Sequence, residues 1–238
     1  MIKMYMWLRI IILFFIPIYC YHMNIGSTGL LFPYTLGILA YIKKYAHPTN
    51  YTLTGVSGGT WCSLLYHLEP NIHDHDFLWS ILVGNKTEKI CLLNRKSMKT
   101  FQNNVAKNFK LQYKNVDVST IPLSIIVTNI KNKKLISTKV DNFDDFDDLI
   151  NFCMCSSYIP FISGKGFYTT YKTNKYIDGE IFRNKKLFQD KSIIIHKDLW
   201  DRKHSLSSKF ILDFHNSKIL FDQGWNDAKC NNIEKELK

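Results

Sequence analysis

The pattern Gly55-Val56-Ser57-Gly58-Gly59 constrains the fold of this 238-residue chain more than any other feature. It follows a strand-like run at residues 51–54 and precedes the helix-like run TWCSLLYHL at residues 60–68. Glycines beside Ser57 allow the sharp strand-to-helix turn that exposes a serine hydroxyl above the end of a sheet. A Gly-x-Ser-x-Gly match alone is weak, because small residues cluster in many loops. In this context it predicts a nucleophilic serine at the carboxyl end of a strand.

A second strand, loop and helix precede this elbow. An extended stretch at residues 21–25 leads into Gly26-Ser27-Thr28-Gly29, and apolar residues at helical spacing follow over residues 36–42. Backbone N–H groups at such a helix start can bind an anion. The competing interpretation is an ordinary turn, in which glycine only relieves steric crowding.

A third informative segment is Tyr176-Ile177-Asp178-Gly179, which places a carboxylate at a tight turn after a strand-like run. Most Asp-Gly pairs are turns without further chemistry. Between the elbow and this turn, the chain shows two strand candidates, a helix candidate and then Ser156-Ser157-Tyr158-Ile159-Pro160. The order of these segments is more specific than any one of them.

In this order the segments resemble those of the patatin-like phospholipases, and the resemblance runs from about Tyr21 to Ala228. That family carries an oxyanion loop, then Gly-x-Ser-x-Gly, then a Ser-x-x-Ile-Pro-like segment, and then Asp-Gly. The late segment Gly224-Trp225-Asn226-Asp227-Ala228 also resembles the Gly-x-x-Asp-Ala helix start of many members.

The resemblance implies a three-layer α/β/α fold with a central, mostly parallel sheet, and one patatin-like domain over residues 21–238. It also implies hydrolysis of fatty acyl esters of phospholipids or glycerides, without a metal or an organic cofactor. Ser57 is then the nucleophile and Asp178 the base of a Ser-Asp dyad. The same resemblance assigns the oxyanion hole to Ser27, Thr28, Gly29 and Gly58, and the remaining motif positions to Gly55, Gly59 and Gly179.

The chain departs from the family pattern at two places. The family loop is commonly Gly-Gly-Gly-x-Arg/Lys-Gly, whereas residues 27–32 read Ser-Thr-Gly-Leu-Leu-Phe, and Glu180 stands where glycine or alanine is common. A catalytically weak or silent lipid-binding member is therefore one alternative. An α/β-hydrolase with a Ser-Asp-His triad is another, because three histidines follow Asp178 in the chain order of a triad, namely His196, His204 and His215.

Apolar periodicity gives a fold class without any resemblance. Strands alternate with helices, which predicts an α/β sheet, at least partly parallel, with helices on its faces. The chain is 46% hydrophobic and 21% charged, which suffices for one domain with a sizeable core. We expect strands at residues 21–25, 50–55, 121–129, 134–140, 173–177 and 192–196, helices at 33–45, 58–68, 74–83, 97–109 and 145–157, and one or two late helical turns within 209–222.

Residues 1–20 form a segment of their own. Lys3 and Arg9 precede an almost uninterrupted apolar run from Ile10 to Tyr19. A basic start and a short apolar core are typical of a secretory signal peptide or signal anchor. The run is shorter than the roughly 20 residues that span a bilayer. The segment therefore predicts a membrane-associated or secretory location, with a buried first strand or helix as the competing interpretation.

The charge balance favours an anionic partner. Thirty-one Lys and Arg against 20 Asp and Glu leave a formal charge of +11. A membrane surface is the expected partner, because each basic group near anionic lipid contributes about 1 kcal/mol to binding. Nucleic acid is not expected, since no recognised nucleic-acid-binding motif accompanies the charge.

Three other groups of polar residues could suggest metal sites or disulfides. His73-Asp74-His75-Asp76 is more typical of a helix cap than of a metal site. The acidic run at residues 141–148 lacks the glycine and terminal glutamate of a calcium loop, and it is more typical of a helix start. The six cysteines lack metal-ligand spacing, so no metal is expected.

Overall fold

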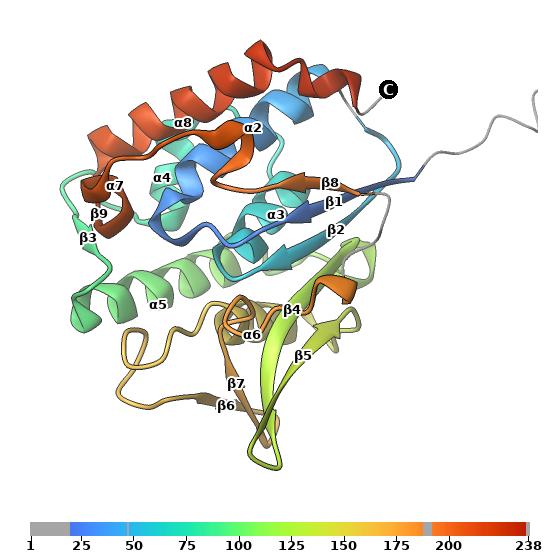
Figure 1. Ribbon diagram of the computed structural model, residues 1–238, viewed down its shortest axis with the longest axis vertical. Helices are drawn as coiled ribbons and strands as arrows, with labels where there is room; N and C mark the ends of the chain where they lie inside the picture. Colours follow the sequence, from blue (N-terminus) through green and yellow to red (C-terminus); the bar gives the residue numbers. More distant parts are fainter. Residues whose placement is uncertain (1–19, 47, 188–191, 237–238) are drawn as a thin grey trace, which may run out of the picture.

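The computed structural model describes residues 20–46, 48–187 and 192–236. Its main sheet has the strand order β6-β7-β4-β2-β1-β8, with β5 paired to the free side of β4 (Figure 1). The strands are β1 Tyr21–Ile25, β2 Tyr51–Val56, β4 Leu123–Lys131, β5 Lys134–Val140, β6 Thr169–Tyr171, β7 Asn174–Ile177 and β8 Ile193–Ile195. Strands β8, β1, β2 and β4 are parallel, and β5, β6 and β7 add antiparallel pairs.

Helices pack on this sheet and on one another. They are α2 Phe32–Tyr45, α3 Gly58–Leu68, α4 His75–Leu82, α5 Arg95–Gln112, α6 Phe146–Ser156, α7 Leu206–Phe210 and α8 Phe214–Cys230. The core between them contains large, fully buried side chains such as Trp79, Tyr34 and Phe109. The predicted α/β class is confirmed, and the arrangement agrees with three layers around a mostly parallel sheet.

Strands β2 and β7 meet end to end beside β4. Strand β2 runs parallel to β4 and ends with Val56 opposite Ile126. Strand β7 runs antiparallel to β4 and ends with Ile177 opposite Thr128. The residues that follow the two strands, Ser57 and Asp178, must therefore converge from opposite directions. This register positions the candidate site.

Helices α2 and α8 cross at two glycines. A Cβ atom at Gly37 would lie 2.0 Å from the Phe221 carbonyl oxygen, and one at Gly224 would lie 1.9 Å from the Tyr34 carbonyl oxygen. Only glycine allows the two backbones to approach so closely. Gly224 and Asp227 were predicted to start a helix. This prediction is wrong, because both lie deep inside α8, which begins at Phe214 after the cap Asp213.

Most predicted elements are found within a few residues of their expected limits, and helix 58–68 and strand 134–140 have the expected limits. The late helical turns were underestimated, since α8 has 17 residues. Strand β6 and the small sheet of β3 Ile90–Cys91 with β9 Ile211–Leu212 were not predicted, because such short strands carry no periodicity. The predicted targeting segment lies, except for Cys20, outside the described residues. Within them, no helix is long and apolar enough to cross a membrane.

Candidate active site

Ser57 occupies the turn between β2 and α3 in a strained conformation. Its φ is 53° and its ψ is −129°, a backbone region that residues other than glycine rarely adopt. Such strain costs on the order of 1–3 kcal/mol and persists only where the surrounding structure fixes it. The geometry is that of a nucleophile elbow, which lifts the serine hydroxyl above the end of the strand.

The glycines of the elbow allow close contacts with its neighbours. A Cβ atom at Gly59 would lie 2.3 Å from the Gly26 carbonyl oxygen, and one at Gly55 would lie 2.6 Å from Thr60 Cα. The first contact brings the start of α3 against the loop after β1. The second closes the turn itself. Glycine at both positions is therefore a steric requirement of the elbow.

Ser57 and Asp178 are hydrogen-bonded to each other. Ser57 Oγ donates to Asp178 Oδ2 at 2.5 Å, although the two residues are 121 positions apart in the chain. The other carboxylate oxygen, Oδ1, accepts the backbone N–H of Glu180 at 2.8 Å, and Thr128 Oγ1 donates to the Asp178 carbonyl oxygen at 3.0 Å. Both Ser57 and Asp178 are buried. The sequence-predicted nucleophile and base are thus in direct contact.

Burial controls the charge of Asp178. Removal from water raises the pKa of its carboxyl to about 6, although the hydrogen bonds from Ser57 and from the Glu180 N–H oppose the rise. In the described residues no Lys, Arg or His donates a hydrogen bond to this carboxylate. A carboxyl with a pKa of about 6 is ionised at neutral pH yet more basic than an exposed aspartate. This is the property that a general base needs.

The backbone of Gly179 fixes the position of the Asp178 carboxylate. A Cβ atom at Gly179 would lie 2.2 Å from the Ile126 carbonyl oxygen, so the turn after β7 presses against β4. The Gly179 N–H donates to the Ser156 carbonyl oxygen at 2.9 Å. Glu180, the departure from the family pattern, turns away and pairs with Arg183 at 3.3 Å. Its presence leaves the Ser57–Asp178 contact intact.

The backbone N–H groups of Gly29 and Gly58 lie near Ser57, and neither has a backbone acceptor among the described residues. The first turn of α3 leaves the Gly58 N–H without an intrahelical partner. A Cβ atom at Gly58 would lie 2.2 Å from Thr28 Oγ1 and 3.5 Å from the Gly29 nitrogen, so the two groups are neighbours. Together they can hold an oxyanion.

The unusual loop keeps the backbone conformation that this role needs. Gly29 has a φ of 54°, whereas Thr28 has an ordinary right-handed conformation that any residue adopts. Gly29 is the one residue of 27–32 with a positive φ, which explains how the loop can lack the other three glycines of the family pattern. Ser27 is half-buried and, unlike Gly29 and Gly58, does not line the pocket next to Ser57. Of the four predicted oxyanion residues, the structure brings Thr28, Gly29 and Gly58 together.

Residues of the Ser156–Pro160 segment hold the Ser57 turn in place through hydrogen bonds. Ser156 Oγ accepts the Ser57 N–H at 2.9 Å and donates to the Ile126 carbonyl oxygen at 2.7 Å. Ser157 Oγ accepts the Trp61 indole N–H at 3.2 Å. The amide of Ser57 is thereby occupied, so it is not an oxyanion donor. The sequence placed this segment in order but gave it no structural role.

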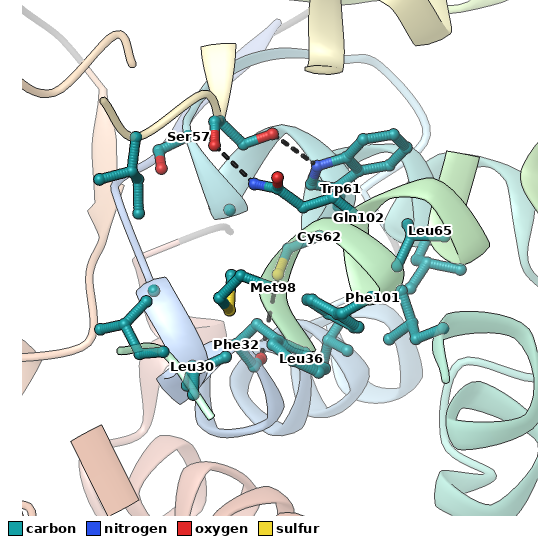
Figure 2. Close-up of a pocket in the computed structure, with 17 residues that line it drawn as sticks. Leu30, Phe32, Leu36, Ser57, Trp61, Cys62, Leu65, Met98, Phe101 and Gln102 are labelled. Carbon is teal, nitrogen blue, oxygen red and sulfur yellow. Dashed lines mark hydrogen bonds between the residues drawn. The ribbon is translucent and has the colours of Figure 1, made fainter. Parts of the chain in front are cut away.

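An apolar pocket opens beside Ser57. Figure 2 shows Ser57 at its edge, with Met98, Phe101 and Leu36 among the side chains that project into it. The space between these side chains that admits a water-sized group is about 50 Å³. Apart from Ser57, its polar side chains are Gln102 and Ser157, and Gln102 Nε2 donates to the Ser157 carbonyl oxygen at 2.7 Å. The pocket thus suits an apolar chain attached to a group that reacts at Ser57.

Helix α5 contributes much of this pocket, and sequence reasoning missed its role. Met98, Phe101, Gln102 and Val105 follow one another at helical spacing and all line the pocket. The apolar spacing was visible in the sequence, but it cannot show whether a face covers a core or a cavity. Only the fold places this face opposite Ser57.

The three candidate triad histidines make their polar contacts away from Ser57 and Asp178. His196 follows β8 and approaches Asp198, with Nδ1 3.4 Å from a carboxylate oxygen. His204 Nε2 is 2.8 Å from the Lys197 carbonyl oxygen, and His215 is exposed on α8. No histidine in the described residues is hydrogen-bonded to Ser57 or Asp178. The observed arrangement is a dyad.

The other polar clusters are structural. Asp74 caps α4 by accepting the Phe77 N–H at 3.1 Å, and Asp145 caps α6 by accepting the Asp148 N–H at 2.7 Å. Both segments are helix caps, as the sequence predicted. Among the described residues, no group of His, Cys, Asp or Glu side chains is arranged to hold a metal ion, and all six cysteines are free thiols.

The comparisons with known proteins gave no match, either in a scan against models of protein families or in a search of curated proteins. The geometry around Ser57 is therefore the main basis for a functional assignment.

Proposed function

We propose that this chain is a patatin-like lipid acyl hydrolase, which cleaves fatty acyl esters of phospholipids or glycerides with Ser57 and Asp178. One observation carries the proposal: a strained elbow serine donates a 2.5 Å hydrogen bond to a buried carboxylate at the mouth of an apolar pocket. The resemblance in the order of sequence motifs supports the same assignment.

In the proposed first step, Ser57 Oγ attacks the ester carbonyl carbon while Asp178 Oδ2 accepts the serine proton. The carbonyl oxygen gains negative charge, and the N–H groups of Gly29 and Gly58 stabilise it. One such donor typically lowers the barrier by about 2.7–4 kcal/mol. The C–O bond then breaks, the proton passes from Asp178 to the leaving alcohol, and an acyl-enzyme remains.

In the second step, Asp178 takes a proton from water, which attacks the acyl-enzyme carbonyl. The same donors stabilise the second oxyanion, and Ser57 regains its proton as the fatty acid leaves. The acyl chain occupies the pocket formed by α2, α3 and α5 in both steps. Because the pocket walls are apolar, binding is favourable for long acyl chains and poor for polar acyl groups.

The experiment that tests this proposal compares the wild-type chain with Ser57→Ala and Asp178→Asn. Each is incubated with a fluorophosphonate probe and with a panel of phospholipids and neutral glycerides. We expect labelling of Ser57 and release of fatty acid from the wild type only. A folded wild-type protein that binds lipid vesicles but is neither labelled nor active would instead identify it as a catalytically silent lipid-binding member.

A membrane-associated or secretory location remains part of this proposal. It rests on residues 1–20 and on the positive charge of the chain. Fusion of residues 1–20 to a reporter protein should direct the reporter to membranes or to the secretory route. A reporter that stays in the soluble fraction and is not secreted would contradict this part alone.

A further inference from the structure

Exposed apolar side chains surround the mouth of the Ser57 pocket. Leu92 and Ile159 line the pocket, and each is followed within two residues by an exposed side chain, Leu93 (70% exposed) and Phe161 (62% exposed). Helix α7 packs against the 3-10 turn Gly29–Leu31, which precedes α2, and the Phe210 carbonyl oxygen accepts the Leu92 N–H at 2.8 Å. Three segments far apart in the chain thus form what we call the pocket rim, with the exposed residues Leu93, Phe161, Phe167, Leu206, Phe210 and Ile211.

The backbone at Phe161 is strained in a way that presents this side chain to solvent. Its φ is 63°, which is an outlier for a bulky residue. The Phe161 N–H donates to the Gly166 carbonyl oxygen at 3.1 Å, and the Tyr158 hydroxyl donates to the same oxygen at 3.0 Å. The Phe161 ring packs only 6.1 Å from the exposed ring of Phe167. A fixed loop therefore displays two aromatic rings that contribute little to the core.

The pocket rim also includes four basic side chains. Arg95, Lys96, Lys99 and Lys165 are exposed around an open groove between the start of α5 and the loop after α6. None of these four forms an ion pair with an acidic side chain of the described chain. Residues 89–116 contain seven Lys or Arg and no Asp or Glu. In Figure 1 the start of α5, α7 and the loop between α6 and β6 all lie at the left of the molecule.

We propose that the pocket rim is a docking surface for an anionic phospholipid bilayer. The inference rests on the proposed function and assigns this site its membrane-facing side. Apolar side chains interleaved with basic ones are the composition of surfaces that lie in the bilayer interface. When the protein docks in this orientation, the mouth of the pocket faces the lipid. An acyl chain then passes from bilayer to pocket without crossing water.

Charge alone does not distinguish lipid from single-stranded nucleic acid, which also binds basic grooves with aromatic residues. The aliphatic members of the rim favour lipid. Leu93, Leu206 and Ile211 provide no ring on which a base can stack, but they can be buried among acyl chains. The rim also surrounds the mouth of an apolar pocket, which suits an acyl chain better than a base.

The first test removes charge from the rim. Every protein is the full chain with Ser57→Ala, so binding is measured without hydrolysis, and residues 1–20 are the same in all. The rim variant carries Arg95→Gln, Lys96→Gln and Lys165→Gln. The control carries the same loss of charge at the exposed turn between β4 and β5, with Lys131→Gln, Lys133→Gln and Lys134→Gln. Binding to vesicles of phosphatidylglycerol and phosphatidylcholine is measured by co-sedimentation.

We expect the rim variant to bind about a hundredfold more weakly than the parent, since each basic group near an anionic surface contributes about fivefold. The control should bind at least tenfold more tightly than the rim variant. Equal binding by the two variants would overturn the proposal, because the attraction would then depend on net charge and not on this face. Loss of oligonucleotide binding without loss of vesicle binding would overturn it in favour of nucleic acid.

The second test removes apolar area. Phe167 and Ile136 are 46% and 44% exposed, so Phe167→Ser and Ile136→Ser remove similar exposed surfaces inside and outside the rim. Phe161→Gly removes the most prominent ring and also relieves the positive φ, so the Tm should be unchanged or higher. We expect vesicle binding to fall about tenfold for Phe167→Ser and Phe161→Gly, and to change less than twofold for Ile136→Ser. Undiminished binding by both rim variants would overturn the proposal.

These outcomes are separate from those of the proposed function. Fluorophosphonate labelling tests Ser57 in the wild-type chain, whereas vesicle binding is measured in its absence. A chain that docks through the rim but is never labelled retains the docking surface and loses the enzyme assignment. A labelled chain whose rim variants bind vesicles normally retains the enzyme assignment and loses the docking surface.

Discussion

Asp178 and Asp227 are both buried aspartates that accept a hydrogen bond from a hydroxyl, yet their surroundings are opposite. Asp178 accepts Ser57 Oγ at 2.5 Å, and Asp227 accepts the Tyr34 hydroxyl at 2.8 Å. Asp227 also binds the guanidinium of Arg202 through both oxygens, whereas no cation of the described chain is hydrogen-bonded to Asp178. One carboxylate has its charge compensated, and the other does not.

The pKa values of the two carboxyls follow from this difference. Burial raises the pKa of Asp178 to about 6. Burial also acts to raise the pKa of Asp227, but the hydrogen bonds from Arg202 and Tyr34 outweigh it and hold the pKa below its usual value. Asp227 is thus fixed as an anion that ties α8 to α2 and to the segment before α7. The comparison separates a carboxylate kept for structure from one that is able to exchange a proton.

The largest expected effect is on catalysis at Asp178. Asp178→Asn keeps the shape of the side chain and can still bond to Ser57 and to the Glu180 N–H, but an amide cannot take the serine proton. We expect kcat/KM for ester hydrolysis to fall by about 10³–10⁴. Far-UV circular dichroism should show that the variant is folded. Asp227→Asn, measured beside it, should keep activity within about tenfold of wild type at a temperature where both are folded.

The same Asp178→Asn variant should be more stable than the wild type at high pH. Because the pKa of Asp178 rises from 3.8 to about 6 on folding, this carboxyl favours folding fully below pH 3.8, and that contribution is lost as the pH rises through about 6. At pH 8 the ionised group costs up to about 3 kcal/mol, which an amide avoids. Urea unfolding at pH 8 and near pH 4 should show a gain at pH 8 that shrinks toward pH 4. Equal stability at both values would contradict the raised pKa.

Replacing one glycine by alanine near Asp178 and one near Asp227 should also have different effects. In Gly58→Ala the new methyl meets Thr28 Oγ1 and displaces the loop that carries the Gly29 N–H. We expect kcat/KM to fall by about a hundredfold, a barrier change of about 2.7 kcal/mol, with little change in Tm. In Gly224→Ala the methyl meets the Tyr34 carbonyl oxygen, so the free energy of unfolding should fall by about 1–3 kcal/mol. The reverse pattern would show that the two glycines have been assigned the wrong roles.

Asp227→Asn should affect stability with the opposite sign to Asp178→Asn. The variant leaves Arg202 without its counter-charge, and hydrogen bonds to charged groups contribute about 1.5–3 kcal/mol. Because the Arg202 side chain is 35% exposed, water compensates part of this loss, and we expect a destabilisation of about 2 kcal/mol at pH 7. Urea unfolding measures it, with Asp222→Asn on the exposed side of α8 as the control. A stabilised Asp227→Asn would remove the distinction between the two carboxylates.

The sequence predicted the local parts of this comparison better than the distant ones. The Ser57 elbow follows from neighbouring glycines, and its strained φ is a consequence of five consecutive residues. The meeting of β2 and β7 beside β4 depends on strand directions and register, which no local pattern contains. Asp178 could be selected only by its place in a known order of motifs.

Asp227 shows the limit of such an order. The motif placed it at a helix start, but α8 begins 13 residues earlier, at Phe214. Its helical pattern was hard to read because Gly224 and many polar residues interrupt the apolar positions. The partners Tyr34 and Arg202 are 193 and 25 positions away. Tertiary packing, which one sequence does not show, decides the role of this residue.

The smallest expected effects are those of the histidines that could have completed a triad. His196 is the most informative case, because its ring packs against the loop after β1: a Cβ atom at Gly26 would lie 2.5 Å from His196 Cδ2. Burial and the neighbouring Lys197 lower the pKa of His196, and its Nδ1 contacts the carboxylate and the backbone N–H of Asp198. Within the part of the chain that the structure describes, neither His204 nor His215 is hydrogen-bonded to Ser57 or Asp178.

We therefore expect His196→Ala, His204→Ala and His215→Ala each to keep kcat/KM within about tenfold of wild type, a barrier change below about 1.4 kcal/mol. His196→Ala should show the largest loss of the three, since removal of the ring frees the loop that carries the Gly29 N–H. His196→Phe, which keeps a ring at this position, should recover most of that loss. A thousandfold loss in any folded alanine variant would establish a triad, and Asp178 would then orient a histidine instead of accepting the proton of Ser57.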